Sequence, residues 1–245
     1  MDHKFYEKYF ELEKQNWWFR TRRNIIFWLF KEYKISSNDR ILDYGCGSGF
    51  LVGKLQAIGL DASGVDVSDE AIRVGIGRGV KNLYSLDRVR SHFDDNSFDL
   101  VMALDVIEHI KNDKEAIDEL SRVLKPNGHL IIMVPAYQWM WGVQDDVAHH
   151  FRRYSMGSIL KLAGNYSELG VIKKSYFNTF LFPPVAAVRL VSRFLRLKNR
   201  ESDFDISSNL LNKILYRIFN LESNFLKYIN FPFGVSILLV LKKNA

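Results

Sequence analysis

The stretch that most constrains this chain is ILDYGCGSGFL, residues 41–51, in which an apolar run containing Asp43 precedes glycines at every second position. The run predicts a short buried strand. Gly45, Gly47 and Gly49 predict a tight turn into a helix, because glycine adopts positive φ values readily. A strand, glycine loop and helix in this order are typical of a nucleotide site at the carboxyl end of a parallel sheet.

The spacing and charge of this loop restrict its ligand. The glycines follow the pattern G-x-G-x-G, whereas the dinucleotide fingerprint would need glycine at Phe50, and no Gly-Lys-Ser or Gly-Lys-Thr is present. Asp43 would repel a pyrophosphate and suits a cationic group. Asp66 ends the expected second strand, from which an acid accepts hydrogen bonds from ribose hydroxyls. The pocket therefore fits ribose and a positive charge, and the spacing opposes an NAD-dependent dehydrogenase.

Strand and helix patterns alternate beyond the loop. Expected strands at 40–44, 61–66, 82–85, 99–104 and 129–135 alternate with helices of about 10 residues, and the helix after residue 112 ends at Pro126. This alternation predicts an α/β fold with a doubly wound parallel sheet and right-handed crossovers. With 47% hydrophobic and 25% charged residues in 245, one globular domain is expected.

These motifs resemble those of class I S-adenosylmethionine-dependent methyltransferases. ILDYGCGSGFL is similar to the first motif of that family and GVDVS to its second. SFDLVMALDVIEHI and LSRVLKPNGHLIIMVP are similar to its block from the fourth to the fifth strand, so the resemblance covers about residues 38–136. It implies S-adenosyl-L-methionine as cofactor and a Rossmann-like, seven-stranded, mainly parallel sheet whose last strand, VSILLVLKK, is antiparallel.

The resemblance also divides the chain and places cofactor contacts. We expect an N-terminal helical cap (1–37), a cofactor-binding core (38–136), an acceptor-side segment (137–179), a helical insert (180–233) and the last strand (234–245). Asp43 and the glycines would hold the methionine part and Asp66 the ribose, while Asp87 would contact the adenine amine although its flanking residues depart from the family pattern. The full set of expected cofactor contacts is Asp43, Gly45, Cys46, Gly47, Gly49, Asp66, Val67, Asp87, Leu104 and Asp105.

The catalytic candidates follow the fourth and fifth strands. Methyl transfer requires alignment of donor and acceptor, and a base where the nucleophile is an oxygen or nitrogen that carries a proton. The segment WGVQDDVAHHFRRYS resembles an Asp…His-x-Arg-Arg-Tyr pattern of bacterial and archaeal methyltransferases linked to glycolipids or polysaccharides. It suggests His150 as base together with Asp145, and His109 as a further catalytic candidate. The alternative is that these residues form a salt-bridged structural lid.

Further residues are candidates for contacts with the acceptor or with a metal ion. Arg152 and Arg153 could hold an acidic or phosphorylated acceptor, and Trp18, Arg22 and Tyr137 could cover it, although aromatic residues at helical spacing often form core. Asp105, Glu108 and His109 resemble an acid-x-x-Glu-His pattern that binds a divalent cation in some methyltransferases. We expect no metal, because the Glu-His pair also occurs in this superfamily without one.

Charge is unevenly distributed along the chain. Residues 151–245 contain 15 Lys and Arg against 5 Asp and Glu, whereas residues 1–150 contain 19 against 23. Arg189, Arg193, Arg196 and Arg200 recur at helical spacing opposite apolar residues. Such a helix could lie on an anionic membrane surface, or it could pack its apolar face over the acceptor and expose its arginines. No nucleic-acid motif is present, so no nucleic-acid partner is expected.

Location and function follow from these patterns. The N-terminus lacks a secretory signal, apolar runs fall short of the roughly 20 residues that span a bilayer, and the single cysteine fits the reducing cytoplasm. We therefore expect a cytoplasmic protein, with peripheral membrane association as an open alternative. Its expected function is methyl transfer, at oxygen, to a small-molecule or lipid- or glycan-linked acceptor. A non-catalytic, methyltransferase-like binding module is the alternative.

Overall fold

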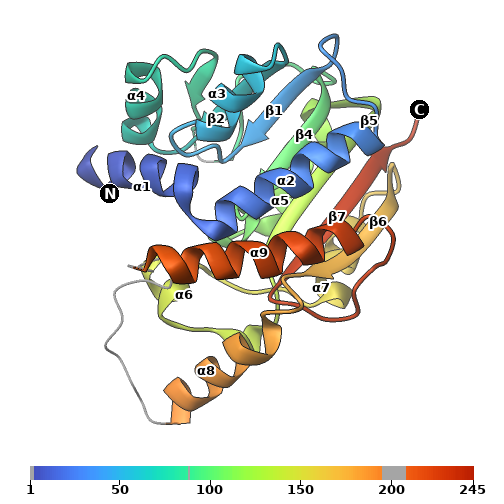
Figure 1. Cartoon of the computed structure of the whole chain (residues 1–245). Coiled ribbons are helices and arrows are strands. Elements are labelled where there is room, and N and C mark those ends of the chain that lie inside the picture. Colours follow the sequence, from blue (N-terminus) through green and yellow to red (C-terminus); the bar gives the residue numbers. More distant parts are fainter. Residues whose placement is uncertain (1–2, 88, 195–207) are drawn as a thin grey trace.

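The structure, a computed structural model, describes residues 3–87, 89–194 and 208–245, and its central element is a mixed sheet of seven strands (Figure 1). The strand order is β3-β2-β1-β4-β5-β7-β6, and β7 runs antiparallel to both neighbours. The α/β prediction with an antiparallel last strand is thereby confirmed. The strands are β1 (Arg40–Tyr44), β2 (Asp61–Asp66), β3 (Leu83–Ser85), β4 (Phe98–Leu104), β5 (Leu124–Pro135), β6 (Leu169–Phe177) and β7 (Ser236–Lys243).

Helices surround this sheet. The α-helices of the described residues are α1 (His3–Gln15), α2 (Trp17–Glu32), α3 (Phe50–Ala57), α4 (Asp69–Gly77), α5 (Asp113–Val123), α6 (Val143–Val147), α7 (Met156–Ala163), α8 (Phe182–Phe194) and α9 (Asn209–Phe225). In Figure 1, α2 and α9 lie side by side across one face of the sheet. Asn24 of α2 donates a 2.7 Å hydrogen bond to Asn220 of α9. Two segments about 190 residues apart in the sequence thus form one layer.

The aromatic residues at the start of α2 fix this layer to the sheet. Trp18 is 9% exposed and stacks on Phe177 of β6 and Phe219 of α9, with ring centroids 5.7 and 5.4 Å apart. Large aromatic side chains bury much apolar area, so this stack ties α2, α9 and the sheet together. Trp18 is therefore held in place at the edge of the site described below.

Two local expectations differ from the structure. The helix expected to reach Pro126 ends at Val123, and β5 begins at Leu124 rather than at residue 129. The reason is strand pairing: Leu124 lies opposite Phe98 of β4, and the register shifts before the next pair, Leu100 and His129. The expected turn at Pro126 is therefore an irregularity within a strand.

The second difference concerns α8. Arg189 was expected to share a face opposite apolar residues, but its guanidinium lies against Gly142 and lines a cavity, while Leu190 and Val191 are 54% and 52% exposed. Of the two alternatives, the one in which the helix packs its apolar face and exposes its arginines is therefore wrong for this part of α8. The side chain of Arg193, and Arg196 and Arg200, lie outside the described residues. Across the described chain, no helix combines the length and apolar character needed to cross a membrane.

Candidate functional site

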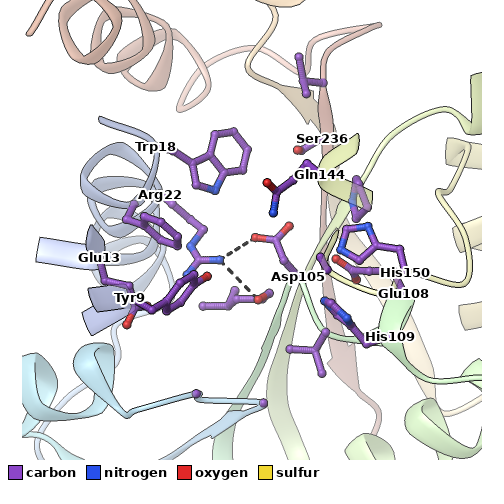
Figure 2. Close-up of a pocket in the computed structure, with 18 of the residues that line it drawn as sticks. Tyr9, Glu13, Trp18, Arg22, Asp105, Glu108, His109, Gln144, His150 and Ser236 are labelled. Carbon is purple, nitrogen blue, oxygen red and sulfur yellow. Dashed lines mark hydrogen bonds and ion pairs between the residues drawn. The ribbon is translucent and has the colours of Figure 1, made fainter. Parts of the chain in front are cut away.

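A cavity of about 1060 Å³ opens at the carboxyl ends of the central strands. It lies between α1 and α2 on one side and the segments after β4 and β5 on the other (Figure 2). Ligand pockets for single small molecules have volumes of roughly 300–1,000 Å³. This cavity therefore has room for a cofactor and a second small molecule.

The glycine loop forms one end of the cavity. Gly45 and Gly47 line it, and both have positive φ, +77° and +55°. A Cβ atom at Gly45 would collide with the side chain of Val106, whereas one at Gly47 would meet nothing within 4 Å. Gly45 is thus required by backbone conformation and by packing, and Gly47 leaves the loop open towards the cavity.

This geometry gives a stability prediction for Gly45→Ala. We expect the free energy of unfolding to fall by about 1–3 kcal/mol, because alanine at positive φ is strained and its methyl group meets Val106. Gly59→Ala is the matched control, since Gly59 has φ +85° but nothing within 4 Å of a Cβ. Urea unfolding of both variants measures the difference. A loss at Gly45 no larger than that at Gly59 would contradict the packing argument.

Buried acids dominate the end of the cavity beside the glycine loop. Burial raises the pKa of Asp43 to about 7, which the Arg22 guanidinium opposes and Asp66 reinforces. Burial likewise raises the pKa of Glu13, on α1, to about 8. The carboxylate of Asp66 accepts backbone hydrogen bonds from Gly47 (2.8 Å) and Ser68 (2.9 Å). A cationic group bound beside these acids would stabilise their anionic forms and so lower their pKa values.

Arg22 lies between the two ends of the cavity. It donates to the carboxylate of Asp105 at 2.6 Å and to the carbonyl of Leu104 at 3.4 Å (Figure 2). Asp105 has φ +59°, a conformation that is uncommon for residues other than glycine. Non-glycine residues in strained conformations concentrate at functional sites. The ion pair therefore holds Asp105 at the end of β4, facing α2.

His150 and Asp145 form the hydrogen-bonded pair at the opposite end. His150 Nδ1 lies 2.8 Å from Asp145 Oδ1, and Asp145 also accepts from Arg153 (2.7 Å) and from the backbone of Gly142 (2.8 Å). Although burial opposes it, these hydrogen bonds lower the pKa of Asp145 to about 2. Because Asp145 is an anion, Nδ1 of His150 carries the hydrogen and donates it. In the neutral form of the ring, Nε2 is then the proton acceptor.

Glu108 and His109 adjoin His150 (Figure 2). One possible ligand atom from each of the three lies within 4.8 Å of the others, and the rings of His109 and His150 meet edge to face at 4.5 Å. Burial raises the pKa of Glu108 well above its ordinary value, and neither of its carboxylate oxygens has a hydrogen-bond partner within the described chain. Burial, with His150 nearby, lowers the pKa of His109 to about 4, so its imidazole is neutral.

The remaining expected site residues divide into two groups. Cys46, Val67, Leu104 and Trp18 line the cavity together with Arg153, which fixes Asp145. Five others do not line it, for reasons visible in their contacts: Asp87 is exposed and forms an isolated β-bridge with Arg90, Gly49 is the N-cap of α3, Tyr137 stacks on Tyr176, Asp145 lies behind His150, and Arg152 pairs with Asp113.

The structure also adds residues to the cavity that sequence patterns did not single out. Tyr9 and Glu13 come from α1 and Gln144 from α6, and Figure 2 shows them facing the same space. The charges of α1 are scattered along the helix without a motif, so no sequence signal marks Glu13. The alternative metal set of Asp105, Glu108 and His109 is not the group that the structure brings together, because Asp105 pairs with Arg22 and His150 lies beside Glu108 and His109.

Comparisons with known proteins agree with this fold and loop. The model of a family described as "Methyltransferase domain" matches residues 42–132. A ubiquinone biosynthesis O-methyltransferase from Rickettsia typhi is 29% identical over 142 residues, which are 51% of this chain and 58% of that protein. The chain thus matches only about half the length of such curated relatives.

Two solved structures share the fold. One, from Haloferax volcanii, is a complex with the Trm112 methyltransferase activator. It has a TM-score of 0.61 and 17% identity, covering 96% of this chain and 93% of that one. The other is phosphoethanolamine N-methyltransferase 2 from Haemonchus contortus with S-adenosyl-L-methionine, with a TM-score of 0.57 and 20% identity, covering 91% and 53%. Residues 42–132 therefore form a methyltransferase domain, and the sheet has the fold of the class I S-adenosylmethionine-dependent methyltransferases.

Proposed function

We propose that this chain transfers the methyl group of S-adenosylmethionine to a hydroxyl oxygen of a small-molecule acceptor. The observation that carries the proposal is the single cavity that joins the glycine loop and Asp43 to His150. Cofactor and acceptor can therefore meet without a rearrangement of the sheet. The name of the Rickettsia typhi relative, an O-methyltransferase, supports oxygen as the acceptor atom.

In this proposal the cofactor occupies the end with the buried acids. Asp43 binds the ammonium group, Gly45 and Gly47 allow the methionine part to approach the backbone, and Asp66 accepts hydrogen bonds from the ribose hydroxyls. Glu13 adds negative charge beside the cationic ligand. A cofactor with a sulfonium and an ammonium group, and no phosphate, matches the charge of this end.

His150 acts as the general base at the other end. The hydroxyl oxygen of the acceptor attacks the methyl carbon, the bond from carbon to sulfur breaks, and the sulfur leaves as the neutral thioether of S-adenosylhomocysteine. The hydroxyl proton passes to Nε2 of His150, and the Asp145 anion stabilises the resulting imidazolium through Nδ1. Arg153 and the backbone of Gly142 hold Asp145 in place for this role.

Trp18 and Arg22 bound the space between the two ends. Trp18, held by its aromatic stack, supplies a flat apolar wall, and Arg22 supplies positive charge next to Asp105. We place the acceptor between this wall and His150. Arg152, engaged with Asp113 and the carbonyl of Lys111, supports the same segment from outside the cavity.

The test is methyl transfer itself. The whole chain is incubated with S-adenosylmethionine labelled in the methyl group and with phenols, carboxylic acids, amines and a lipid extract, each in turn. We expect labelled product from a hydroxyl-bearing acceptor, and label in the lipid extract would identify a lipid-linked acceptor. Binding of S-adenosylhomocysteine without transfer to any class would favour a non-catalytic binding module.

A divalent cation is a second candidate for the cluster of Glu108, His109 and His150. The observation that favours it is the buried Glu108 carboxylate, which lacks a hydrogen-bond partner within the described chain and lies beside two imidazoles. Carboxylate and imidazole ligands suit several divalent metals. A bound cation would lower the pKa of an acceptor hydroxyl, so that the cluster would still promote its deprotonation.

Calorimetric titration with Mg²⁺, Mn²⁺ and Zn²⁺ separates the two roles of this cluster. A cation site predicts saturable binding that Glu108→Gln abolishes, and transfer that stops in EDTA and returns with metal. His150 acting alone as base predicts no saturable binding and unchanged transfer in EDTA. Asp113→Asn is the control, since Asp113 is an acid outside the cluster that pairs with Arg152.

A further inference from the structure

An aromatic surface surrounds the base of α8. It is formed by Trp139, Phe180, Phe182, Phe225 and Phe233, which we call the aromatic platform. Four of these side chains are 40–46% exposed, and Phe182 joins them, with ring centroids 6.1 Å from Trp139 and 5.5 Å from Phe233. Phe180 lies 6.3 Å from Phe225. Three segments of the chain therefore contribute partly exposed rings to two aromatic groups, one at Phe182 and one at Phe180.

Neighbouring residues extend this surface. On α8, which projects away from the sheet in Figure 1, Leu190 and Val191 are more than half exposed. After α9, Tyr228 is 85% and Ile229 48% exposed. Single exposed apolar side chains are normal, but this many exposed apolar side chains on α8 and on the segments at its base indicate an interaction surface.

The charged residues of the two segments that carry most of the platform are mainly basic. Residues 180–194 and 209–233 contain five basic residues and a single acid, Glu222. Glu222 is 1% exposed and its carboxylate accepts a 2.8 Å hydrogen bond from the backbone of Phe180, so it is buried inside the platform and not displayed on it. Of the basic residues, Lys213, Arg217 and Lys227 are exposed, whereas Arg189 lines the cavity and the side chain of Arg193 lies outside the described residues. The charged partner that complements this surface is an anion.

We propose that the aromatic platform and α8 dock on an anionic lipid bilayer. Aromatic side chains favour the boundary between headgroups and acyl chains, and basic residues are attracted to anionic headgroups. A protein partner would also bury apolar groups, but the combination of exposed rings, exposed aliphatic residues on a projecting helix and the exposed basic residues Lys213, Arg217 and Lys227 fits a lipid surface best. Val188 of α8 is 45% exposed and lines the cavity, so the docked face lies beside the cavity mouth.

Co-sedimentation of the whole chain with lipid vesicles tests this. Phosphatidylcholine vesicles are compared with vesicles that also contain phosphatidylglycerol, without cofactor or acceptor. We expect binding to the anionic vesicles that weakens as salt is added, and at least about tenfold weaker binding to the neutral ones. Equal binding to both, or none to either, would overturn the proposal.

The variant Leu190→Asp, Val191→Asp localises the surface. We expect at least about tenfold weaker vesicle binding, because apolar contacts are lost and negative charges are added. Ile58→Asp, Ile76→Asp is the matched control, since both residues are exposed at the ends of α3 and α4, away from α8 in Figure 1. Equal effects of the two variants would refute the assignment to α8.

Two further measurements complete the test. Calorimetry with S-adenosylhomocysteine should give the same affinity for the α8 variant as for the wild type, which shows that the variant is folded and separates docking from the proposed function. Light scattering without vesicles tests the alternative that a second copy of the chain covers this face. Wild-type dimers that the α8 variant converts to monomers, together with no vesicle binding, would assign the face to self-association and overturn the proposal.

Discussion

Replacing Asp43 by asparagine is expected to weaken binding of S-adenosylhomocysteine by about 10- to 100-fold, since hydrogen bonds to charged groups contribute roughly 1.5–3 kcal/mol. Asp43 is 5% exposed, so its carboxylate meets a cationic ligand with little screening by water. Asparagine keeps the shape and removes the charge. Calorimetry on both proteins measures the change. Asp61→Asn, at an exposed acid on the neighbouring strand, is the control and should bind as the wild type does.

The affinity for S-adenosylhomocysteine should also change with pH in a defined direction. With a pKa of about 7, Asp43 is mainly protonated and neutral at pH 6 and anionic at pH 8. Affinity for the cationic ligand should therefore rise as pH increases through 7, and this step should be absent in Asp43→Asn. Glu13, with a pKa of about 8, adds a second step that the variant retains. An affinity that falls over this range, or an unchanged affinity in Asp43→Asn, would remove Asp43 from the cofactor site.

His150→Ala is expected to lower kcat by about 10²- to 10⁴-fold, the usual contribution of a general base. Its effect on the affinity for S-adenosylhomocysteine should be small, because His150 lies at the acceptor end of the cavity. The measurement is transfer to whichever acceptor the labelled screen identifies, alongside calorimetry with the product. His149→Asn is the matched control: His149 is exposed, and asparagine tolerates its φ of +56°.

Several outcomes would remove His150 from the reaction. Equal losses of kcat and cofactor affinity would mean that the substitution disrupts the fold of the cavity. An unchanged kcat would assign His150 and Asp145 to a purely structural link. Asp145→Asn is the supporting variant, and we expect it to lower kcat as well, since the amide can no longer hold the imidazolium as an anion does.

The convergence of the proposed cofactor residues could be predicted from sequence because its determinants are local. Asp43 and the glycines lie on one strand and one turn, and Asp66 ends the next strand, so their meeting follows from parallel pairing of β1 and β2. The seven-stranded sheet with an antiparallel last strand was expected from the family resemblance, because the pairing of β7 with β5 joins distant segments and has no local signal.

Other features depend on distant contacts and carry no local signal. Arg22 and Asp105 are 83 residues apart, and their ion pair depends on how α2 lies across the sheet. His109 and His150 belong to segments after different strands and meet only in the folded chain. The orientation of α8 depends on the close contact between Arg189 and Gly142, which helical spacing cannot show. Long-range packing therefore determines the geometry of the cavity around His150 and which face of α8 is exposed.

The central claim is that the cavity holds S-adenosylmethionine beside an acceptor. Calorimetric titration of the whole wild-type chain with S-adenosylhomocysteine tests it most directly, with NAD⁺ as the comparison ligand. We expect one binding site per chain with a micromolar dissociation constant, and no competition from NAD⁺. No binding heat with millimolar S-adenosylhomocysteine, or displacement by NAD⁺, would contradict the account.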